Sequence, residues 1–412
     1  MRMTRREAVL GLAGLGLAGC GGAATAPVPA VARTEWRATP NPGFDAWLEG
    51  FRGRAAAQGI DSATIQSALR GAGYLPKVVE RDRNQTEFSR SLEDYLAIAA
   101  SDDRVAMGRD KLRRHAATLA AVESRYGVEA RVVTAVWGLE SYYGTRMGDA
   151  PVISALATLA YDGRRGEFFE KQLVAALKII QSGDISTAAM TGSWAGAMGH
   201  TQFIPTSYLA YAVDFTGDGR RDIWSADPTD ALASTAAYLQ RFGWRRGQPW
   251  GLEVALPAGF DAGLTGRSRR QNVGNWSALG VRPAAGGTLP DHGPAAVLAP
   301  AGVTGPAFLV FRNFDVILRY NNAESYGIGI GHLSDRIAGG GPIRGRFPPD
   351  AYGLTIDERR QLQARLTAAG FDTGGTDGVI GPQTRAAIAA YQQSVGLPAT
   401  GDPSQALLRR LG

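Results

Sequence analysis

One glutamate interrupts a strongly apolar stretch, residues 132–149, which reads VVTAVWGLESYYGTRMGD. If this stretch is a helix, Val133, Val136 and Trp137 precede Glu140 at spacings that place all of these side chains on one stripe. Removal from water favours the neutral form of a carboxylate and raises its pKa. Such a group can donate a proton to a leaving oxygen, as in glycoside cleavage. The alternative is that the helix ends just before the glutamate, which then points into solvent.

A glycine-rich stretch, GSWAGAMGHTQFIPTSY at residues 192–208, offers polar groups suited to the same chemistry. Its small residues allow the backbone to approach another surface closely. Gln202 can donate and accept hydrogen bonds toward a sugar hydroxyl or amide, and Phe203 and Tyr208 offer aromatic faces for stacking on a sugar ring. Taken alone, the stretch fits a glycine-rich turn before an apolar segment equally well.

The acidic stretch DFTGDGRRDIWSADPTD, residues 214–230, follows part of the oxygen-ligand spacing of an EF-hand calcium loop. The twelfth position of the loop is Ser225 instead of the usual glutamate, so a later aspartate would have to reach back. The candidate ligands are Asp214, Thr216, Asp218, Asp222 and Asp230. These residues predict a structural calcium ion, with no cofactor required for catalysis. The alternative is a pair of polar turns that expose acidic groups.

The elements that must position these groups are mainly helical. Apolar residues recur at helical spacing up to about residue 245, whereas short apolar runs between glycines and prolines at 247–310 indicate small strands. A Gly/Pro-rich linker is predicted at 339–353. Beyond it, a capping box from Thr355 to Glu358 opens the first of three short helices. We therefore predict a mainly α fold with a small β-containing subdomain and a small three-helix C-terminal domain.

The size and charge of the chain limit its class and its partners. A length of 412 residues exceeds what one hydrophobic core usually supports, so several domains are expected. The formal net charge is +6 without a long basic run, so no nucleic-acid partner is expected. The four histidines show no metal-binding spacing, which argues against a catalytic zinc.

The N-terminus, MRMTRREAVLGLAGLGLAGC, has the pattern of an export signal. A basic start precedes an apolar run that is too short to span a bilayer. Its last four residues resemble the lipobox of bacterial lipoproteins, which makes Cys20 the expected lipidation site after a signal peptide of residues 1–20. Residues 21–42 are predicted to form a flexible tether, and the glycine after Cys20 favours the outer membrane. An unlipidated secretory signal is the alternative.

Four segments together are more specific than any of them alone. WGLESYYG, ALATLAYDGRRGEFF, GSWAGAMGHTQFIPTSYLAYAVDFTGDGRRDIW and DALASTAAYL resemble, in order and spacing, the membrane-bound lytic murein transglycosylase B family. The resemblance covers about residues 43–335. It implies a lysozyme-like helical catalytic domain, placed here at 43–338, that cleaves the glycan strands of peptidoglycan in the periplasm.

The resemblance also assigns roles to residues. It implies that Glu140 is the single catalytic acid and base. The substrate-binding residues that it implies are Arg164, Arg165, Ser193, Gln202, Tyr320, Asn321 and Tyr326, beside the stacking role predicted for Phe203. The family usually has Arg-Ser where this chain has Asn322-Ala323, which affects the detail around Asn321.

A single carboxylate suffices in the chemistry that the resemblance implies. Glu140 would protonate the glycosidic oxygen and then accept the proton of the sugar's own C6 hydroxyl, which forms a 1,6-anhydromuramic end. Two alternatives stay open: a hydrolysing muramidase on the same scaffold, and a non-catalytic murein-binding lipoprotein.

The C-terminal segment, residues 354–412, resembles the three-helix peptidoglycan-binding domain, most clearly in DGVIGPQT. By this likeness it would hold the substrate while a flexible linker lets the catalytic domain search nearby. The expected partners are peptidoglycan strands and, through the lipid, a membrane. The protein is expected to be a monomer.

Overall fold

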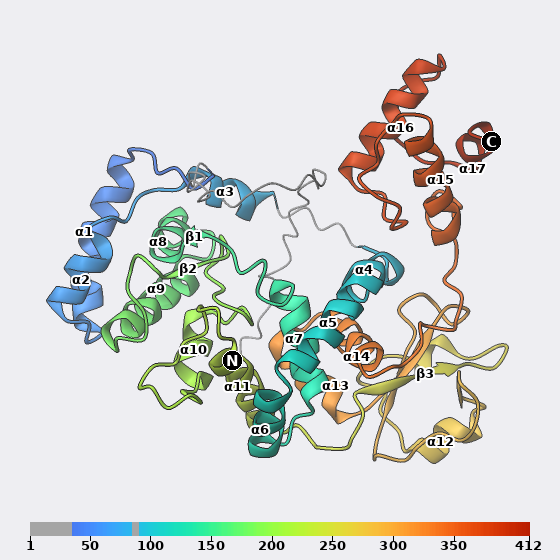
Figure 1. Cartoon of the computed structure of the whole chain (residues 1–412), viewed down its shortest axis with the longest axis horizontal. Coiled ribbons are helices and arrows are strands. Elements are labelled where there is room, and N and C mark those ends of the chain that lie inside the picture. The colour runs from blue at the N-terminus through green and yellow to red at the C-terminus, as the bar shows by residue number, and fades with distance from the viewer. Residues whose placement is uncertain (1–34, 85–89) are drawn as a thin grey trace.

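The computed structural model describes residues 35–84 and 90–412 (Figure 1). The predicted signal peptide, Cys20 and most of the predicted tether lie outside the described residues. The chain is mainly helical with small antiparallel sheets, and three hydrophobic cores lie in its main helical body, in its β subdomain and at its C-terminus. The predicted fold class is therefore confirmed.

The first helices pack around the edge of the main body. Two of them begin with proline, one of which is also capped by asparagine, and the other two are capped by aspartate or serine. They are α1 (Pro42–Ala57), α2 (Ser62–Leu69), α3 (Pro76–Arg83) and α4 (Leu92–Ala99).

A central helix, α7 (Ala130–Ser141), is buried along almost its whole length. It packs against α5 (Asp102–Arg114), α6 (Ala116–Tyr126), α11 (Thr229–Arg241) and α14 (Glu324–Ile337). Figure 1 shows α7 near the middle of the molecule, between these neighbours. An apolar helix in this position holds its C-terminal end firmly in place, which matters because Glu140 lies there.

The elements that follow α7 form the second wall of the main body. A two-residue strand, β1 (Ala150–Pro151), pairs with β2 (Thr191–Gly192), which begins the glycine-rich stretch. The helices of this wall are α8 (Val152–Asp162), α9 (Gly166–Gln181) and α10 (Pro205–Tyr211).

The β subdomain is a four-stranded antiparallel sheet with strand order β4-β3-β6-β5. It has its own core around Trp276, which is fully buried. Its elements are β3 (Gly251–Ala255), the short 3₁₀ helix η1 (Ala262–Leu264), α12 (Val273–Ala278), β4 (Arg282–Pro283), β5 (Ala296–Leu298) and β6 (Ala307–Val310). Helix α13 (Arg312–Tyr320) then returns the chain to the main body.

The C-terminal domain consists of α15 (Ile356–Ala368), α16 (Pro382–Ser394) and α17 (Gln405–Arg410) around a small core. The capping box predicted from Thr355 to Glu358 is present. In Figure 1 this domain stands apart from the sheet and nearest to the α4 side of the main body.

The segment between the two domains is held more tightly than a flexible linker would be. Glu253 accepts hydrogen bonds from the backbone N–H groups of Arg344 and Gly345, and Phe347 packs on the main core. Beyond it, Arg359 is only 2% exposed and forms ion pairs with Glu93 at 2.5 Å and Asp94 at 2.9 Å, both on α4. Residues 339–353 contain no helix or strand, as expected of a linker. These contacts nevertheless contradict the flexibility predicted for the segment.

The described end of the predicted tether is also packed. Trp36 is 8% exposed, and its indole N–H donates to Asp149 at 2.7 Å. The prediction of a flexible tether as far as residue 42 is therefore wrong from Trp36 onward. Within the described part of the chain, no helix combines the length and the apolar character needed to cross a membrane.

Candidate active site

Glu140 lies in the last turn of α7 and is half-buried. The helix continues to Ser141, so the alternative in which it ends before the glutamate is wrong. Val136 and Trp137 are buried on the predicted stripe. The hydroxyl of Tyr326, on α14, donates a hydrogen bond to Glu140 Oε1 at 2.6 Å. The carboxylate is therefore oriented by a fixed donor at the end of a rigid helix.

Backbone strain is concentrated around this carboxylate. Among the described residues, the non-glycine residues with a positive φ are Tyr142 at 51°, Tyr143 at 58° and Gln202 at 54°. Left-handed backbone costs free energy for residues with a Cβ, and it persists only where the surrounding structure holds it. Two of these residues directly follow the turn of Glu140, and the third belongs to the glycine-rich stretch. Strain of this kind is typical of functional sites.

The glycine-rich stretch folds into a tight loop beside the end of α7. Ser193 Oγ accepts the N–H of Ala197 at 3.0 Å, and the Gln202 amide donates to the carbonyls of Met147 at 2.9 Å and Gly199 at 2.8 Å. The bond to Met147 joins this loop to the segment that follows α7, and the bond to Gly199 closes the loop on itself. The group of Gln202 that can serve a ligand is its amide oxygen, which accepts but does not donate.

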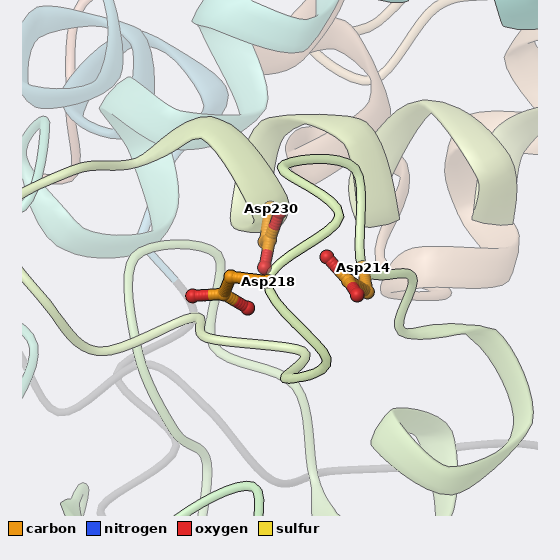
Figure 2. Close-up of side chains that lie close together, drawn as sticks. All are labelled: Asp214, Asp218 and Asp230. Carbon is orange, nitrogen blue, oxygen red and sulfur yellow. The ribbon is translucent and has the colours of Figure 1, made fainter.

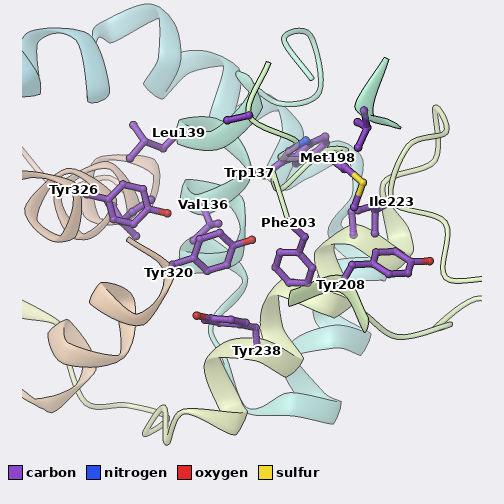
Figure 3. Packing of buried hydrophobic residues seen from close by; sticks show 14 of the residues in the cluster. Val136, Trp137, Leu139, Met198, Phe203, Tyr208, Ile223, Tyr238, Tyr320 and Tyr326 are labelled. Atoms are coloured by element: carbon purple, nitrogen blue, oxygen red, sulfur yellow. The ribbon is translucent and has the colours of Figure 1, made fainter. Parts of the chain in front are cut away.

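Two aromatic residues expected to stack on a sugar are core residues instead. Phe203 and Tyr208 are both fully buried (Figure 3). Phe203 packs against Tyr238 and Tyr320, and the Tyr208 ring lies against Trp224. The prediction that Phe203 and Tyr208 stack on a ligand is therefore wrong, because neither ring presents a face to solvent.

The end of α13, the start of α14 and the segment between them carry the other predicted residues. Tyr320 is buried, and its hydroxyl donates to the carbonyl of Thr201 in the glycine-rich loop at 2.6 Å. Asn321 is half-buried, and its side chain accepts the N–H of Ala323 at 3.1 Å. Tyr326 completes the set through its bond to Glu140, and burial together with that carboxylate raises the pKa of Tyr326. Tyr326 therefore keeps its proton and acts as a donor.

Tyr95, on α4, is a residue near the site that no sequence pattern indicated. Its hydroxyl is buried and has no hydrogen-bond partner among the residues that the structure describes. Burial raises the pKa of Tyr95, and the charge of Glu140 adds to this rise. The only available signal was one polar aromatic residue in a short apolar helix, which is too common to be diagnostic.

The arginine pair is anchored by a buried carboxylate. Arg164 contacts both carboxylate oxygens of Asp82 at 2.7 Å, and Arg165 donates to the same group at 3.1 Å. The Asp82 side chain is 1% exposed, whereas Arg164 remains half exposed at the turn between α8 and α9. The place of this pair in substrate binding stays a prediction.

Three of the predicted metal ligands lie close together in the acidic loop, residues 214–230. Asp214, Asp218 and Asp230 each offer an oxygen within 4.8 Å of the others (Figure 2). Asp230 is buried, which raises its pKa, and it accepts the N–H groups of three loop residues. Asp222 is not one of this group; one of its oxygens accepts the N–H groups of Trp224 and Ser225. Thr216 donates its hydroxyl to Asp214 at 3.2 Å. An oxygen-rich pocket of this kind suits a hard divalent cation.

Comparison with known proteins gives two family matches. Residues 43–335 match the transglycosylase SLT domain, and residues 355–411 match a peptidoglycan binding domain. The membrane-bound lytic murein transglycosylase B of Escherichia coli is 35% identical over 217 residues, which cover 52% of this chain and 58% of that protein. The match thus spans a little over half the length of this curated relative.

Two solved structures have a fold similar to that of this chain. SltB3 of Pseudomonas aeruginosa, in complex with NAG-NAM-pentapeptide, is 51% identical, with a TM-score of 0.74 over 90% of this chain and 100% of that one. The Escherichia coli lytic transglycosylase Slt35, in complex with calcium, is 28% identical, with a TM-score of 0.61 over 72% of this chain and 93% of that one.

Proposed function

Because the chain belongs to the transglycosylase SLT domain family, we propose that it is a lytic transglycosylase that cleaves the glycan strands of peptidoglycan. The bond is the β-1,4 link between N-acetylmuramic acid and N-acetylglucosamine. The observation that carries this proposal is the half-buried Glu140, held by Tyr326 at a strained helix end within a fold of this family. The relative that holds NAG-NAM-pentapeptide supports a substrate of the same chemical class.

The proposed reaction needs one carboxylate and no water. Glu140 gives its proton to the glycosidic oxygen as the bond from that oxygen to the muramic C1 breaks. The oxygen of the sugar's C6 hydroxyl then bonds to C1, and the hydroxyl proton passes to the ionised Glu140. The sugar's own hydroxyl is already close to C1, which gives it a large proximity advantage over water. One group that acts first as acid and then as base is thereby regenerated in each turnover.

The contacts of two acidic residues that follow Glu140 in the sequence support a mechanism with a single carboxylate. Glycoside hydrolysis usually needs a second carboxylate as nucleophile or as the base that activates water. Asp149 accepts the indole N–H of Trp36, and Asp162 forms an ion pair with Arg83 at 2.6 Å. These two acids, which are close to Glu140 in the sequence, are therefore engaged by other partners.

The product distinguishes the proposed reaction from its alternatives. Purified sacculi digested with the protein should release muropeptides that are lighter by one water than hydrolysis products and that resist reduction by borohydride. Reducible ends would show a hydrolysing muramidase. Binding to sacculi without any released fragment would show a non-catalytic murein-binding lipoprotein.

Three further parts of the proposal concern metal, wall and membrane. Asp214, Asp218 and Asp230 would hold a calcium ion that ties the acidic loop to α11, and the calcium complex of Slt35 supports this. The C-terminal domain would hold peptidoglycan, as its family match suggests. Cys20 would carry a lipid that anchors the monomeric protein in the outer membrane, facing the periplasm. Cys20→Ser should then release the protein from the membrane fraction.

A further inference from the structure

A buried histidine connects the acidic loop to the helix that carries Glu140. His200 lies in the glycine-rich loop and is 4% exposed. The Trp137 indole N–H donates to its Nδ1 at 3.1 Å, and its Nε2 lies 2.7 Å from the carbonyl oxygen of Ser225. An indole nitrogen can only donate and a carbonyl oxygen can only accept, so Nδ1 is bare and Nε2 carries the proton. Burial lowers the pKa of His200, which is consistent with this neutral ring.

The backbone of His200 also forms hydrogen bonds to both α7 and the acidic loop. Its carbonyl oxygen accepts the hydroxyl proton of Ser141 at 2.5 Å, and its N–H donates to the carbonyl of Ile223 at 2.9 Å. Ser141 is the residue after Glu140, and its Oγ also accepts the N–H of Gly144 at 2.9 Å. His200 therefore contacts α7 on both sides of Glu140, through Trp137 and through Ser141.

The turn after Glu140 is built against the His200 ring. A Cβ atom at Gly144 would lie 2.4 Å from His200 Nδ1, so only glycine fits there. Tyr142, Tyr143 and Gly144 have consecutive positive φ values of 51°, 58° and 86°. A strained turn of this kind keeps its shape only while its neighbours hold it. The ring of His200 is one of these neighbours.

On the side away from α7, His200 is connected to the acidic loop. The side chain of Asp222 accepts the N–H groups of Trp224 and Ser225, which fixes the carbonyl that receives the His200 proton. The N–H of Asp222 in turn donates to Asp230 at 3.0 Å. A continuous set of hydrogen bonds thus runs from Asp230 to Trp137 and Ser141.

We propose that His200 is a positioning residue: it transmits the arrangement of the acidic loop to the end of α7 and so places Glu140 for catalysis. The inference rests on the proposed function, since it concerns the placement of that carboxylate. Histidine suits this role because a rigid ring carries an acceptor and a donor on opposite edges. A small displacement of a catalytic group lowers the rate strongly while substrate binding is retained.

The test separates the two halves of the bridge. In His200→Gln, the amide nitrogen can still donate to Ser225, but the acceptor for Trp137 is lost. In His200→Asn, the amide oxygen can still accept from Trp137, but the donor to Ser225 is lost. Each variant is expected to lower kcat on sacculi by about tenfold or more and to change KM by less than about threefold. His115 is the matched control: its ring packs on Trp137 at 5.3 Å, and within the described residues no hydrogen bond joins it to the acidic loop, so His115→Asn should keep its kcat.

A double-mutant cycle tests the connection itself. Asp222→Ala should lower kcat in the wild type, because Ser225 loses its support, but should add little in the His200→Gln background, where the bridge is already broken. If a His200 variant fails to fold, Trp137→Phe removes the same N–H bond and keeps an aromatic ring in its place.

Two results would overturn the inference: kcat within about twofold of wild type in both His200 variants, or full additivity with Asp222→Ala. Failure of the proposed function is separate, because wild-type protein would then release no muropeptides, or Glu140→Gln would release as many.

Discussion

The bond from Tyr326 to Glu140 gives the sharpest prediction about the site. Tyr326 is 2% exposed, and its hydroxyl lies 2.6 Å from Glu140 Oε1. Tyr326→Phe keeps the buried ring and removes only this donor. A hydrogen bond to a charged group contributes about 1.5–3 kcal/mol. If the bond holds the carboxylate in its reactive position, kcat should fall roughly 10- to 150-fold. The release of soluble muropeptides from sacculi, measured over a range of substrate concentrations, gives kcat and KM.

Tyr208→Phe is the matched control for this prediction. Tyr208 is also fully buried, and its hydroxyl donates at 2.6 Å to the backbone carbonyl of Arg221, away from Glu140. This change should cost about 1 kcal/mol of unfolding free energy. Because Arg221 belongs to the acidic loop that His200 connects to α7, a small loss of kcat is expected, well below that of Tyr326→Phe. Full kcat in Tyr326→Phe would refute the reasoning, and so would an equal loss of kcat in both variants, since that would indicate a general effect of losing a buried hydroxyl.

Three other predictions concern pH, domain contact and metal. Burial lowers the pKa of His332 from 6.5 to about 4, so the unfolded chain binds more protons than the folded protein between these pH values. The unfolding free energy should therefore fall by up to about 3 kcal/mol as the pH drops through this window. His332→Asn should flatten this pH dependence when the unfolding free energy is measured by urea titration. Arg359→Leu leaves the carboxylates of Glu93 and Asp94 without their ion pairs and should destabilise the protein by about 3 kcal/mol. It should also make residues 339–353 sensitive to protease. Unchanged resistance of this segment to protease would contradict a docked C-terminal domain. Calcium should raise the Tm of the wild type but not that of Asp218→Asn, which removes one of the three clustered carboxylates. Asp227 is exposed and lies outside this cluster, so the Tm of Asp227→Asn should rise with calcium as the Tm of the wild type does.

Local patterns in the sequence predicted the parts of the fold that local interactions determine. The apolar stripe before Glu140 became a buried helix, and the capping box at Thr355 opens α15. The acidic loop also gathers three of its predicted ligands, because closely spaced aspartates and glycines fold back on themselves.

Contacts between distant segments could not be predicted in this way. Asp82 holds Arg164 across 82 residues of sequence, and no local pattern links the two. The side of the loop on which Phe203 lies depends on the left-handed backbone of Gln202, which residue types do not reveal. The linker looked flexible because it is rich in glycine and proline, but Glu253 and the ion pairs of Arg359 hold it from outside the segment.

The origin of the oxygen at the new muramic end tests the central claim most directly. Sacculi are digested in water enriched in heavy oxygen, with the wild type and with Glu140→Gln in parallel, and the released fragments are weighed by mass spectrometry. One carboxylate working with the sugar's own C6 hydroxyl predicts anhydro ends without label from the wild type and almost no release from Glu140→Gln. Labelled, reducible ends, or undiminished release from Glu140→Gln, would contradict the account.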